Sequence, residues 1–481
     1  MKKLKILYLS DSFKNGYRRY VLLNNLTHKF KVSLVALKMA ENLKPYLNPE
    51  IKVINLNNRS YKIFKLVRII SREDPDILIS TSFLADILSY TGSIFLRKLP
   101  VMVMKTANLN YLNSKRSWLV GWVLKKYFLN TDSILLSTPA IKKRIQDNFN
   151  VPSGKLKVLP DMVDKKLIKK QSREPIEEQK LFKNLEHPVI ITVGELDSIK
   201  EYLNLGEGFK KFLNNNKRGT LVVIGKGRAG NKFINCSGKL GILKNVVFLG
   251  HKTNYYRYMR KADLFVHTFN RGSFPVIILE AMACELPVVA FDYIPGPSQI
   301  ITNGLNGLLV PPDNSRELFL NMEKILNHSG VYKNIQENAR DRLKDFLPEK
   351  IIPNYEKYFS DLIGERKKTV LHLTTDLSKG RSEFFEKVIV KTDSDCKHVV
   401  VILSNLKYNS TLFKKNNIDI KQLSSFFKMI RYVKKLQPAM IHTGFLKANF
   451  YGFIIAVLLA IPVVYSKGSI DKAVQNIRIK N

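Results

Sequence analysis

Residues 270–314 read NRGSFPVIILEAMACELPVVAFDYIPGPSQIITNGLNGLLVPPDN. A glycine-containing loop leads into an apolar, helix-like run that carries one acid, Glu280. A strand-like run, LPVVAF, and a turn rich in proline and glycine follow it. A helix that leads into a buried strand is the repeating element of a parallel sheet with crossover helices, so this stretch predicts an α/β fold.

The same alternation extends through most of the chain, in two series of short apolar runs. The first series contains KILYLS (5–10), KVSLVAL (31–37), DILIST (76–81), VMVMK (101–105) and SILLST (133–138). The second series contains PVIITVG (188–194), TLVVIG (220–225), NVVFLG (245–250), DLFVHT (263–268) and PVVAFD (287–292). Each series predicts a parallel sheet. The polar stretch 165–187 lies between them and is predicted to be a linker.

A second series of blocks, similar to those of the first 105 residues, begins near residue 366. Four blocks recur in order: ILYLSDSFKNG with VLHLTTDLSKG, FKLVRII with FKMIRYV, PDILIST with PAMIHTG, and LPVMVMK with IPVVYSK. Their first residues are 6 and 370, 64 and 427, 75 and 438, and 99 and 461, which gives offsets of 364, 363, 363 and 362. An offset this long predicts a duplicated domain, and chance resemblance between two α/β domains is the alternative. The second copy has no counterpart of residues 188–365.

The chain is strongly basic. Its 481 residues include 79 Lys and Arg against 40 Asp and Glu, a formal net charge of +39. Such an excess favours binding to polyanions, either nucleic acid or an anionic membrane surface. A general lysine-rich bias is the alternative. No RNA-binding aromatic motif or zinc finger accompanies the charge, so we expect no nucleic-acid partner.

Cysteine usage and apolar stretches predict a cytoplasmic protein. The three cysteines (Cys236, Cys284 and Cys396) are far apart, which argues against a disulfide framework or a zinc site. The N-terminal apolar run is too short for a signal peptide. The longest apolar stretch, FYGFIIAVLLAIPVVY (450–465), has 16 residues and is too short to span a bilayer. We expect a helix followed by a buried strand there.

Around Glu280, the turn DYIPGPSQIITNGLNGLLVPP (292–312) and the loop VGELDSIKE (193–201) complete a pattern. With these motifs the chain resembles the retaining glycosyltransferases of family 4, in particular bacterial surface-polysaccharide enzymes. The resemblance implies the GT-B fold, in which two Rossmann-like domains face each other. The implied units are an acceptor-side domain (1–170), a nucleotide-sugar-binding domain (171–365) and a third, partial Rossmann-like domain that repeats the first (366–481).

The resemblance assigns the ribose of the donor to Glu280. This residue stands where the family has the second of two glutamates eight positions apart, and Gly272 replaces the first. A carboxylate suits a vicinal diol because it accepts two hydrogen bonds. The loop before Glu280 would bind the donor diphosphate through backbone N–H groups at a helix N-terminus. This donor-binding loop consists of Ser273, Phe274, Pro275, Val276 and Ile277.

The loop 193–201 supplies further contacts that the resemblance implies. Gly194 and Lys200 match the glycine and the lysine that meet the diphosphate, and Lys200 would stabilise the leaving group. Glu195 stands where the family has an arginine, which reverses the charge. One like-charge contact at about 4 Å costs about 4 kcal/mol at an effective dielectric of about 20. We therefore expect Glu195 to turn away or to pair with Lys200.

In the first domain, Gly16 in KNG (14–16) matches the family's glycine loop, and an ordinary turn is the alternative. Lys105 and Asn108 lie in the region where the family places a histidine near the reacting sugar, and they are the polar candidates there. No metal is implied, because lysines and helix termini would meet the phosphate charge. The D-x-D motif at 393–395 is expected to be a solvated turn.

Together these features predict an enzyme that moves a sugar from a UDP- or GDP-linked donor, with retention and without a metal or other cofactor. The acceptor would be a glycan or a lipid-linked glycan at the inner face of the cytoplasmic membrane. The alternative is an impaired or inactive GT-B protein that serves as a binding subunit, as Gly272, Glu195 and the incomplete second copy suggest. A nucleic-acid-binding protein driven by charge alone is a third hypothesis.

Overall fold

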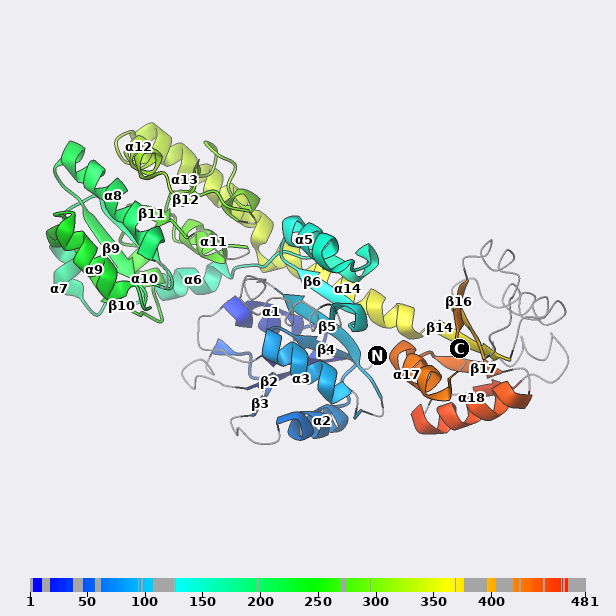
Figure 1. Cartoon of the computed structure of the whole chain (residues 1–481). Coiled ribbons are helices and arrows are strands. Elements are labelled where there is room, and N and C mark those ends of the chain that lie inside the picture. Colours follow the sequence, from blue (N-terminus) through cyan, green and yellow to red (C-terminus); the bar gives the residue numbers. More distant parts are fainter. Residues whose placement is uncertain are drawn as a thin grey trace.

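The chain forms three α/β units, each built on its own parallel sheet (Figure 1). The structure is a computed structural model. It describes residues 3–10, 18–37, 46–56, 62–93, 95–96, 98–106, 125, 127–196, 199–269, 274–294, 296–367, 369–375, 396–403, 418–423, 425–443, 446–459, 461 and 463–465. The predicted α/β architecture is confirmed.

The first sheet has seven parallel strands in the order β3-β2-β1-β4-β5-β6-β7. The strands are β1 (Lys5–Ser10), β2 (Lys31–Ala36), β3 (Lys52–Asn55), β4 (Ile77–Ser80), β5 (Val101–Thr106), β6 (Ser133–Leu136) and β7 (Leu156–Val158). The helices are α1 (Arg18–Leu26), α2 (Lys62–Glu73), α3 (Phe83–Ser93) and α5 (Pro139–Phe149). Successive side chains of a strand point to opposite faces. Tyr8 therefore enters the core with α1, whereas Leu7 enters the core with α2 and α3.

The second sheet has six parallel strands in the order β10-β9-β8-β11-β12-β13. The strands are β8 (Val189–Val193), β9 (Thr220–Ile224), β10 (Val246–Gly250), β11 (Leu264–His267), β12 (Val288–Phe291) and β13 (Leu308–Val310). The helices are α6 (Lys165–Ser172), α7 (Gln179–Lys183), α8 (Ile199–Asn216), α9 (Gly230–Lys239), α10 (Tyr256–Met259), α11 (Val276–Ala283), α12 (Ser315–Leu326), α13 (Ser329–Leu343) and α14 (Pro348–Lys367). Alternate residues of β8 again divide between two cores: Ile190 packs with α8 and α12, and Ile191 packs with α11.

The third sheet has five parallel strands in the order β16-β15-β14-β17-β18, which repeats the arrangement β3-β2-β1-β4-β5. The elements are β14 (Thr369–Thr374), β15 (Lys397–Ile402), β16 (Asp419–Gln422), α17 (Phe426–Leu436), β17 (Met440–Thr443), α18 (Leu446–Leu459) and β18 (Val463–Tyr465). β1 pairs Ile6 with Ile77, and β14 pairs Val370 with Met440 in the equivalent register. This likeness supports the predicted repeat.

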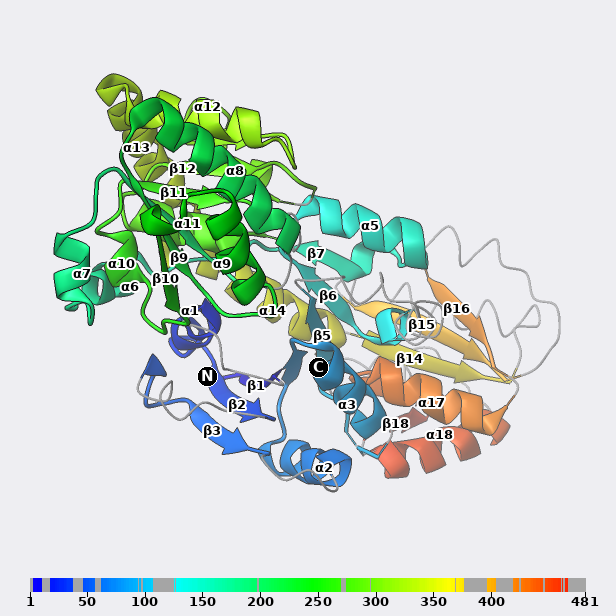
Figure 2. The same ribbon diagram turned by 60° about the vertical axis from the view of Figure 1, so that its left-hand side comes forward.

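The helix α14 returns from the second unit to the first (Figures 1 and 2). Phe359 of α14 packs edge-on against Phe30 of the first core, with ring centroids 6.1 Å apart. The backbone N–H of Val163 donates to the Phe346 carbonyl at 3.1 Å, so the two connections between the units meet at one point. The predicted boundary at residue 365 assigns most of α14 to the second unit. The side chains of α14 nevertheless complete the core of the first unit.

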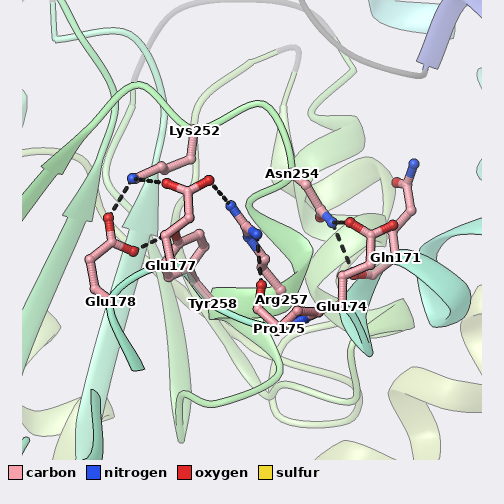
Figure 3. A network of polar contacts seen from close by, with 9 residues as sticks. All are labelled: Gln171, Glu174, Pro175, Glu177, Glu178, Lys252, Asn254, Arg257 and Tyr258. Carbon is pink, nitrogen blue, oxygen red and sulfur yellow. Dashed lines mark hydrogen bonds and ion pairs between the residues drawn. The ribbon is translucent and has the colours of Figure 1, made fainter. Parts of the chain in front are cut away.

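The stretch 165–187 differs from the predicted linker. It forms α6 and α7, and its charged side chains pair with residues around α10 (Figure 3). Glu177 accepts from Lys252 at 2.9 Å and from Arg257 at 2.6 Å, and these hydrogen bonds lower the pKa of its carboxyl group. Asn254 donates to the Gln171 carbonyl at 3.0 Å. The linker prediction was wrong here because its charges are paired with the second unit.

The apolar stretch 450–465 forms the end of α18 and then β18, as predicted. Across the described residues, no helix combines the length and the apolar character needed to cross a membrane. All ten strand-like runs of the sequence also form strands. The short strands β3, β7 and β13 were not predicted.

Candidate nucleotide-sugar site

The order of the second sheet identifies the edge where a ligand would bind. β8 lies between β9 and β11, so the connections after β8 and β11 leave the sheet in opposite directions. In open α/β sheets, ligands bind outside the carboxyl ends of the strands at such a switch point. Gly194 follows β8, and Glu280 lies on α11, the helix that follows β11. Two predicted donor-binding residues therefore belong to this edge.

Glycines let the loops at this edge approach each other closely. A Cβ on Gly194 would lie 2.1 Å from the Phe269 ring, and a Cβ on Gly225 would lie 1.9 Å from the Gly194 carbonyl oxygen. Gly225 also has φ +156°, a conformation that side chains disfavour. The N–H of Gly194 donates to the Ile224 carbonyl at 3.0 Å. The loop after β8 is thus held against the loop after β9.

The loop after β9 is a candidate that the sequence analysis missed. Residues 225–230 read GKGRAG, with glycines spaced as G-x-G-x-x-G between β9 and the start of α9. The N–H of Leu196 donates to the Lys226 carbonyl at 3.1 Å. The side chains of Lys226 and Arg228 are exposed. This spacing between a strand and a helix is a known phosphate-binding signal and was readable from the sequence.

The carboxylate of Glu280 is 1% exposed and is held by two tyrosines next to α10. Tyr255 donates its hydroxyl to Oε2 at 2.9 Å, and Tyr256 donates to Oε1 at 3.2 Å. The tyrosines fix the orientation of the group that is predicted to hold the ribose.

The described part of the loop before Glu280 packs inward. Phe274, Val276 and Ile277 are 7%, 5% and 6% exposed, and Phe274 contacts the Phe346 ring at 5.5 Å. The N–H of Val276 donates to the Phe274 carbonyl at 3.0 Å, and Pro275 is the N-cap of α11. The side chains of this loop thus anchor the start of α11, and the diphosphate contact through its backbone stays a prediction.

Lys200 lies in the first turn of α8 and is 67% exposed. Its amine forms an ion pair with Asp313 at 2.7 Å, and Asn204 donates to the other Asp313 oxygen at 2.9 Å. Glu195 is exposed on the loop between β8 and α8. An exposed pair contributes little stability, so a donor diphosphate can compete with Asp313 for Lys200.

Lys105, the candidate on the first sheet, is a constrained cation near the carboxyl end of β5. Its amine lies 2.5 Å from an Asp161 oxygen and 3.2 Å from the Tyr355 hydroxyl of α14. Ser137 donates to the second Asp161 oxygen at 2.9 Å. Although burial disfavours the charge, the Asp161 carboxylate raises the pKa of Lys105 above its usual range. Lys105 is therefore suited to electrostatic stabilisation and not to proton abstraction.

Several predicted positions lie outside the described residues: Gly16, Asn108, Ser273 and the substituted position Gly272. The remaining candidates divide between two sheets. Gly194, Lys200 and Glu280 belong to the carboxyl edge of the second sheet, and Lys105 belongs to the first. Within the described ranges, no group of three or more His, Cys, Asp or Glu residues could hold a metal ion.

Comparisons with known proteins agree with this geometry. The family model described as "Glycosyl transferases group 1" matches residues 173–342, and the model described as "Glycosyltransferase Family 4" matches residues 22–167. The chain is therefore a glycosyltransferase with the GT-B fold. Its second unit is similar to the group 1 enzymes and its first unit to the family 4 enzymes, over the residues that these two models match.

Individual relatives cover between 64% and 74% of the chain. The N-acetylgalactosamine-N,N'-diacetylbacillosaminyl-diphospho-undecaprenol 4-alpha-N-acetylgalactosaminyltransferase of Campylobacter jejuni is 24% identical over 375 residues, which cover 74% of this chain and 99% of that protein. An uncharacterized glycosyltransferase of Methanocaldococcus jannaschii is 26% identical over 349 residues, covering 64% of this chain and 84% of that protein. The crystal structure of Anabaena Alr3699/HepE in complex with UDP and glucose has a TM-score of 0.62 at 18% identity, covering 74% of this chain and 100% of that chain.

Proposed function

We propose that the chain transfers a sugar from a UDP- or GDP-linked donor to a lipid-linked or surface-polysaccharide acceptor, with retention and without a metal ion. The close approach of Gly194 and Gly225 at the switch point of the second sheet is the observation that carries this proposal. It brings two loops and the cations of Lys200, Lys226 and Arg228 to one edge. Backbone N–H groups and cations suit a nucleoside diphosphate.

The relatives support the chemical class of both substrates. The Campylobacter jejuni protein is named for an acceptor linked through diphosphate to undecaprenol. The Anabaena protein binds UDP and glucose in its crystal structure. Each likeness covers 74% of this chain, and the group 1 family model matches 173–342, which contains the glycine junction and Glu280. We infer a nucleotide-sugar donor and a membrane-linked glycan acceptor for this chain as well.

Each residue then has a physical role in transfer. Glu280, oriented by Tyr255 and Tyr256, accepts hydrogen bonds from the ribose hydroxyls. Lys200 exchanges Asp313 for the diphosphate and stabilises the charge that grows on the leaving group. Lys105 supplies a fixed positive charge from the first sheet. The acceptor hydroxyl forms its bond to the anomeric carbon on the face where the bond to the diphosphate breaks, and the departing phosphate oxygen takes the hydroxyl proton, so the anomeric configuration is retained.

The alternative is a non-catalytic subunit of the same fold. The acid at Glu195, exposed on the loop after Gly194, favours it because an acid repels the donor diphosphate. Such a protein would bind an acceptor glycan or a partner and would release no nucleotide. The third unit, which we propose to be a partial copy of the first, is compatible with both functions.

A transfer assay separates the two functions. The purified chain would be incubated with UDP- and GDP-sugars and a bacterial lipid extract, with and without a chelator, and product formation would be followed by NMR at the anomeric proton. We expect a product with the donor's configuration, formed equally in the chelator. Inverted product would exclude retention, and loss of product in the chelator would exclude the metal-independent step. No nucleotide release with any acceptor would favour the binding subunit.

A further inference from the structure

Helices α2 and α17 occupy equivalent places in the first and third units and expose the same three side chains. Each helix precedes the strand that pairs with the first strand of its sheet, β4 or β17. The exposed side chains are Phe64, Lys65 and Arg68 on α2, and Phe427, Lys428 and Arg431 on α17. We refer to these two sets as the α2 stripe and the α17 stripe. The stripes coincide at the offset of 363 residues that relates the two copies.

Both phenylalanines are largely in solvent. Phe64 is 62% exposed and Phe427 is 81% exposed. The Phe64 ring lies 5.9 Å from the ring of Phe95, which is itself 59% exposed, so the first unit presents two adjacent rings. Single exposed apolar side chains need no explanation. Both units expose the same arrangement, a phenylalanine beside a lysine and an arginine. This repetition indicates that the two stripes belong to one surface.

The α2 stripe continues into a cavity lined by cations. Arg72, two turns beyond Lys65, lines a cavity of about 370 Å³ together with Lys5, Lys31 and Lys52. Glu73 is the one acid among the lining residues, and it pairs with Lys52 at 2.7 Å and Arg72 at 3.4 Å. Four cations against one carboxylate leave a positive cavity that suits a phosphate headgroup.

We propose that the α2 and α17 stripes dock the protein on an anionic lipid surface. The phenylalanines enter the boundary between headgroups and acyl chains, and Lys65, Arg68 and Lys428 meet the lipid phosphates. Arg431 also holds α17 against the first unit. The third unit thus supplies a second docking helix. This inference rests on the proposed transfer to a lipid-linked acceptor.

The placement of the helices agrees with a common surface. In Figures 1 and 2, α2 and α17 lie in the lower part of the molecule, and the second unit lies above them. The surface that α2 and α17 form is therefore separate from the carboxyl edge of the second sheet. α17 also contacts the first unit, because Lys435 donates to the Leu129 carbonyl at 2.9 Å and Arg431 donates to the Tyr90 hydroxyl at 3.4 Å.

Vesicle flotation with the full chain tests the proposal. The vesicles are phosphatidylcholine alone or with phosphatidylglycerol, and the variants are Phe64→Ser/Lys65→Glu and Phe427→Ser/Lys428→Glu. We expect selective binding to the anionic vesicles, about tenfold weaker in each variant and about 100-fold weaker in the combined variant. The matched control, Leu243→Ser/Lys244→Glu, changes an exposed pair on the second unit and should stay within about twofold.

Three outcomes overturn the docking surface: equal binding to neutral vesicles, wild-type binding by a combined variant with an unchanged circular dichroism spectrum, or an equal loss in the control. A single-stranded RNA that binds more tightly than the vesicles through the same residues would also overturn it. Binding of UDP-sugar in solution, measured on the same variants, separates the two proposals. If vesicle binding depends on the stripes and no sugar is transferred, the docking surface stands and the proposed function fails.

Discussion

The third sheet has the same order as five strands of the first, β3-β2-β1-β4-β5, but the two sheets have different interiors. β1 pairs Tyr8 with Ile79, and in the equivalent register β14 pairs His372 with His442. In the first unit this face packs with α1 and α14. In the third unit it carries three buried histidines, His372, His442 and His398. One topology therefore accommodates two kinds of interior.

The histidines form a chain across three strands. His372 Nδ1 lies 2.9 Å from His442 Nδ1, and His372 Nε2 lies 2.9 Å from His398 Nδ1. Because the contacts use both nitrogens of the central ring, the three rings do not converge on one point. Burial lowers the pKa of His372 and His398, and it lowers the pKa of His442 to about 4. The alternation of buried side chains along each strand determines the topology that the two units share. The buried polar groups determine the pH range in which each unit stays folded.

The largest expected effect is on the interior of the first unit. Lys105→Met leaves the Asp161 carboxylate without its cation, and the side chain of Asp161 is only 26% exposed. We expect the free energy of unfolding of the first unit to fall by about 2–3 kcal/mol, below the range for a fully buried pair. Chemical denaturation would measure the change. The double variant Lys105→Met/Asp161→Asn should recover part of the loss, and a loss below about 1 kcal/mol would contradict the ion pair's role.

Acid should destabilise the third unit selectively. His442 has a folded pKa of about 4, below the ordinary value of 6.5, so the unfolded chain binds the proton more readily. Stability is present above about pH 6.5 and falls as the pH drops toward 4, by about 2 kcal/mol at pH 5 from this residue alone. Hydrogen exchange would be measured for β14, β17 and β8 at pH 7 and pH 5. The loss of stability would appear as weaker protection of β14 and β17 at pH 5, relative to β8.

The first unit supplies a matched control for the acid effect. His442→Ile installs the residue that stands at the equivalent position, Ile79, and should reduce the pH dependence of the third sheet, leaving the part that His372 and His398 contribute. Equal acid sensitivity of the second and third sheets in the wild-type chain would contradict the account. Retention of the full pH dependence in the variant would show that His442 is not its source.

A smaller effect is expected where the first and third units touch. Lys435 donates to the Leu129 carbonyl, and burial lowers the pKa of its amine. Lys435→Ala should weaken the docking of α17 by about 1 kcal/mol and increase hydrogen exchange around residues 127–133. Lys428→Ala, on an exposed position of the same helix, is the control. Similar hydrogen exchange in both variants would show that the Lys435 contact does not hold α17 against the first unit.

The smallest effect is expected on donor binding. A chain ended after Lys367 keeps the first two units, including the glycine junction and α14. Its affinity for a nucleotide-sugar should stay within about twofold of the full chain, since no described contact joins the third unit to the second-sheet edge. Calorimetry would measure both affinities. A tenfold loss would show that the third unit contributes to the donor site.

The local sequence pattern was enough to predict the fold. The site was predicted less completely, because contacts between distant parts of the chain hold its residues. Long apolar runs such as 188–194 became strands, because a strand buried on both faces must be apolar throughout. β3 was not predicted because its four residues, KVIN, are only partly buried. The stretch 165–187 was mistaken for a linker because Glu177 and Glu178, which lie between α6 and α7, pair with residues about 80 positions away. Composition does not reveal such contacts.

The same limit applies to the site residues. The sequence pattern singled out Glu280, but not the tyrosines 24 and 25 positions earlier that hold it. It singled out Lys105, but not Asp161, which is 56 positions away. The GKGRAG loop was the exception, because its glycine spacing between a strand and a helix is local and could have been recognised.

The most direct test of the account is nucleotide-sugar binding at the carboxyl edge of the second sheet. Calorimetric titration of UDP- and GDP-sugars would compare the wild-type chain with Glu280→Gln and with Glu207→Gln, an exposed acid on α8. The account predicts binding of at least one donor, weakened at least about tenfold by Glu280→Gln and unchanged by Glu207→Gln. Binding of no nucleotide-sugar, or equal affinity in the Glu280→Gln variant, would contradict it.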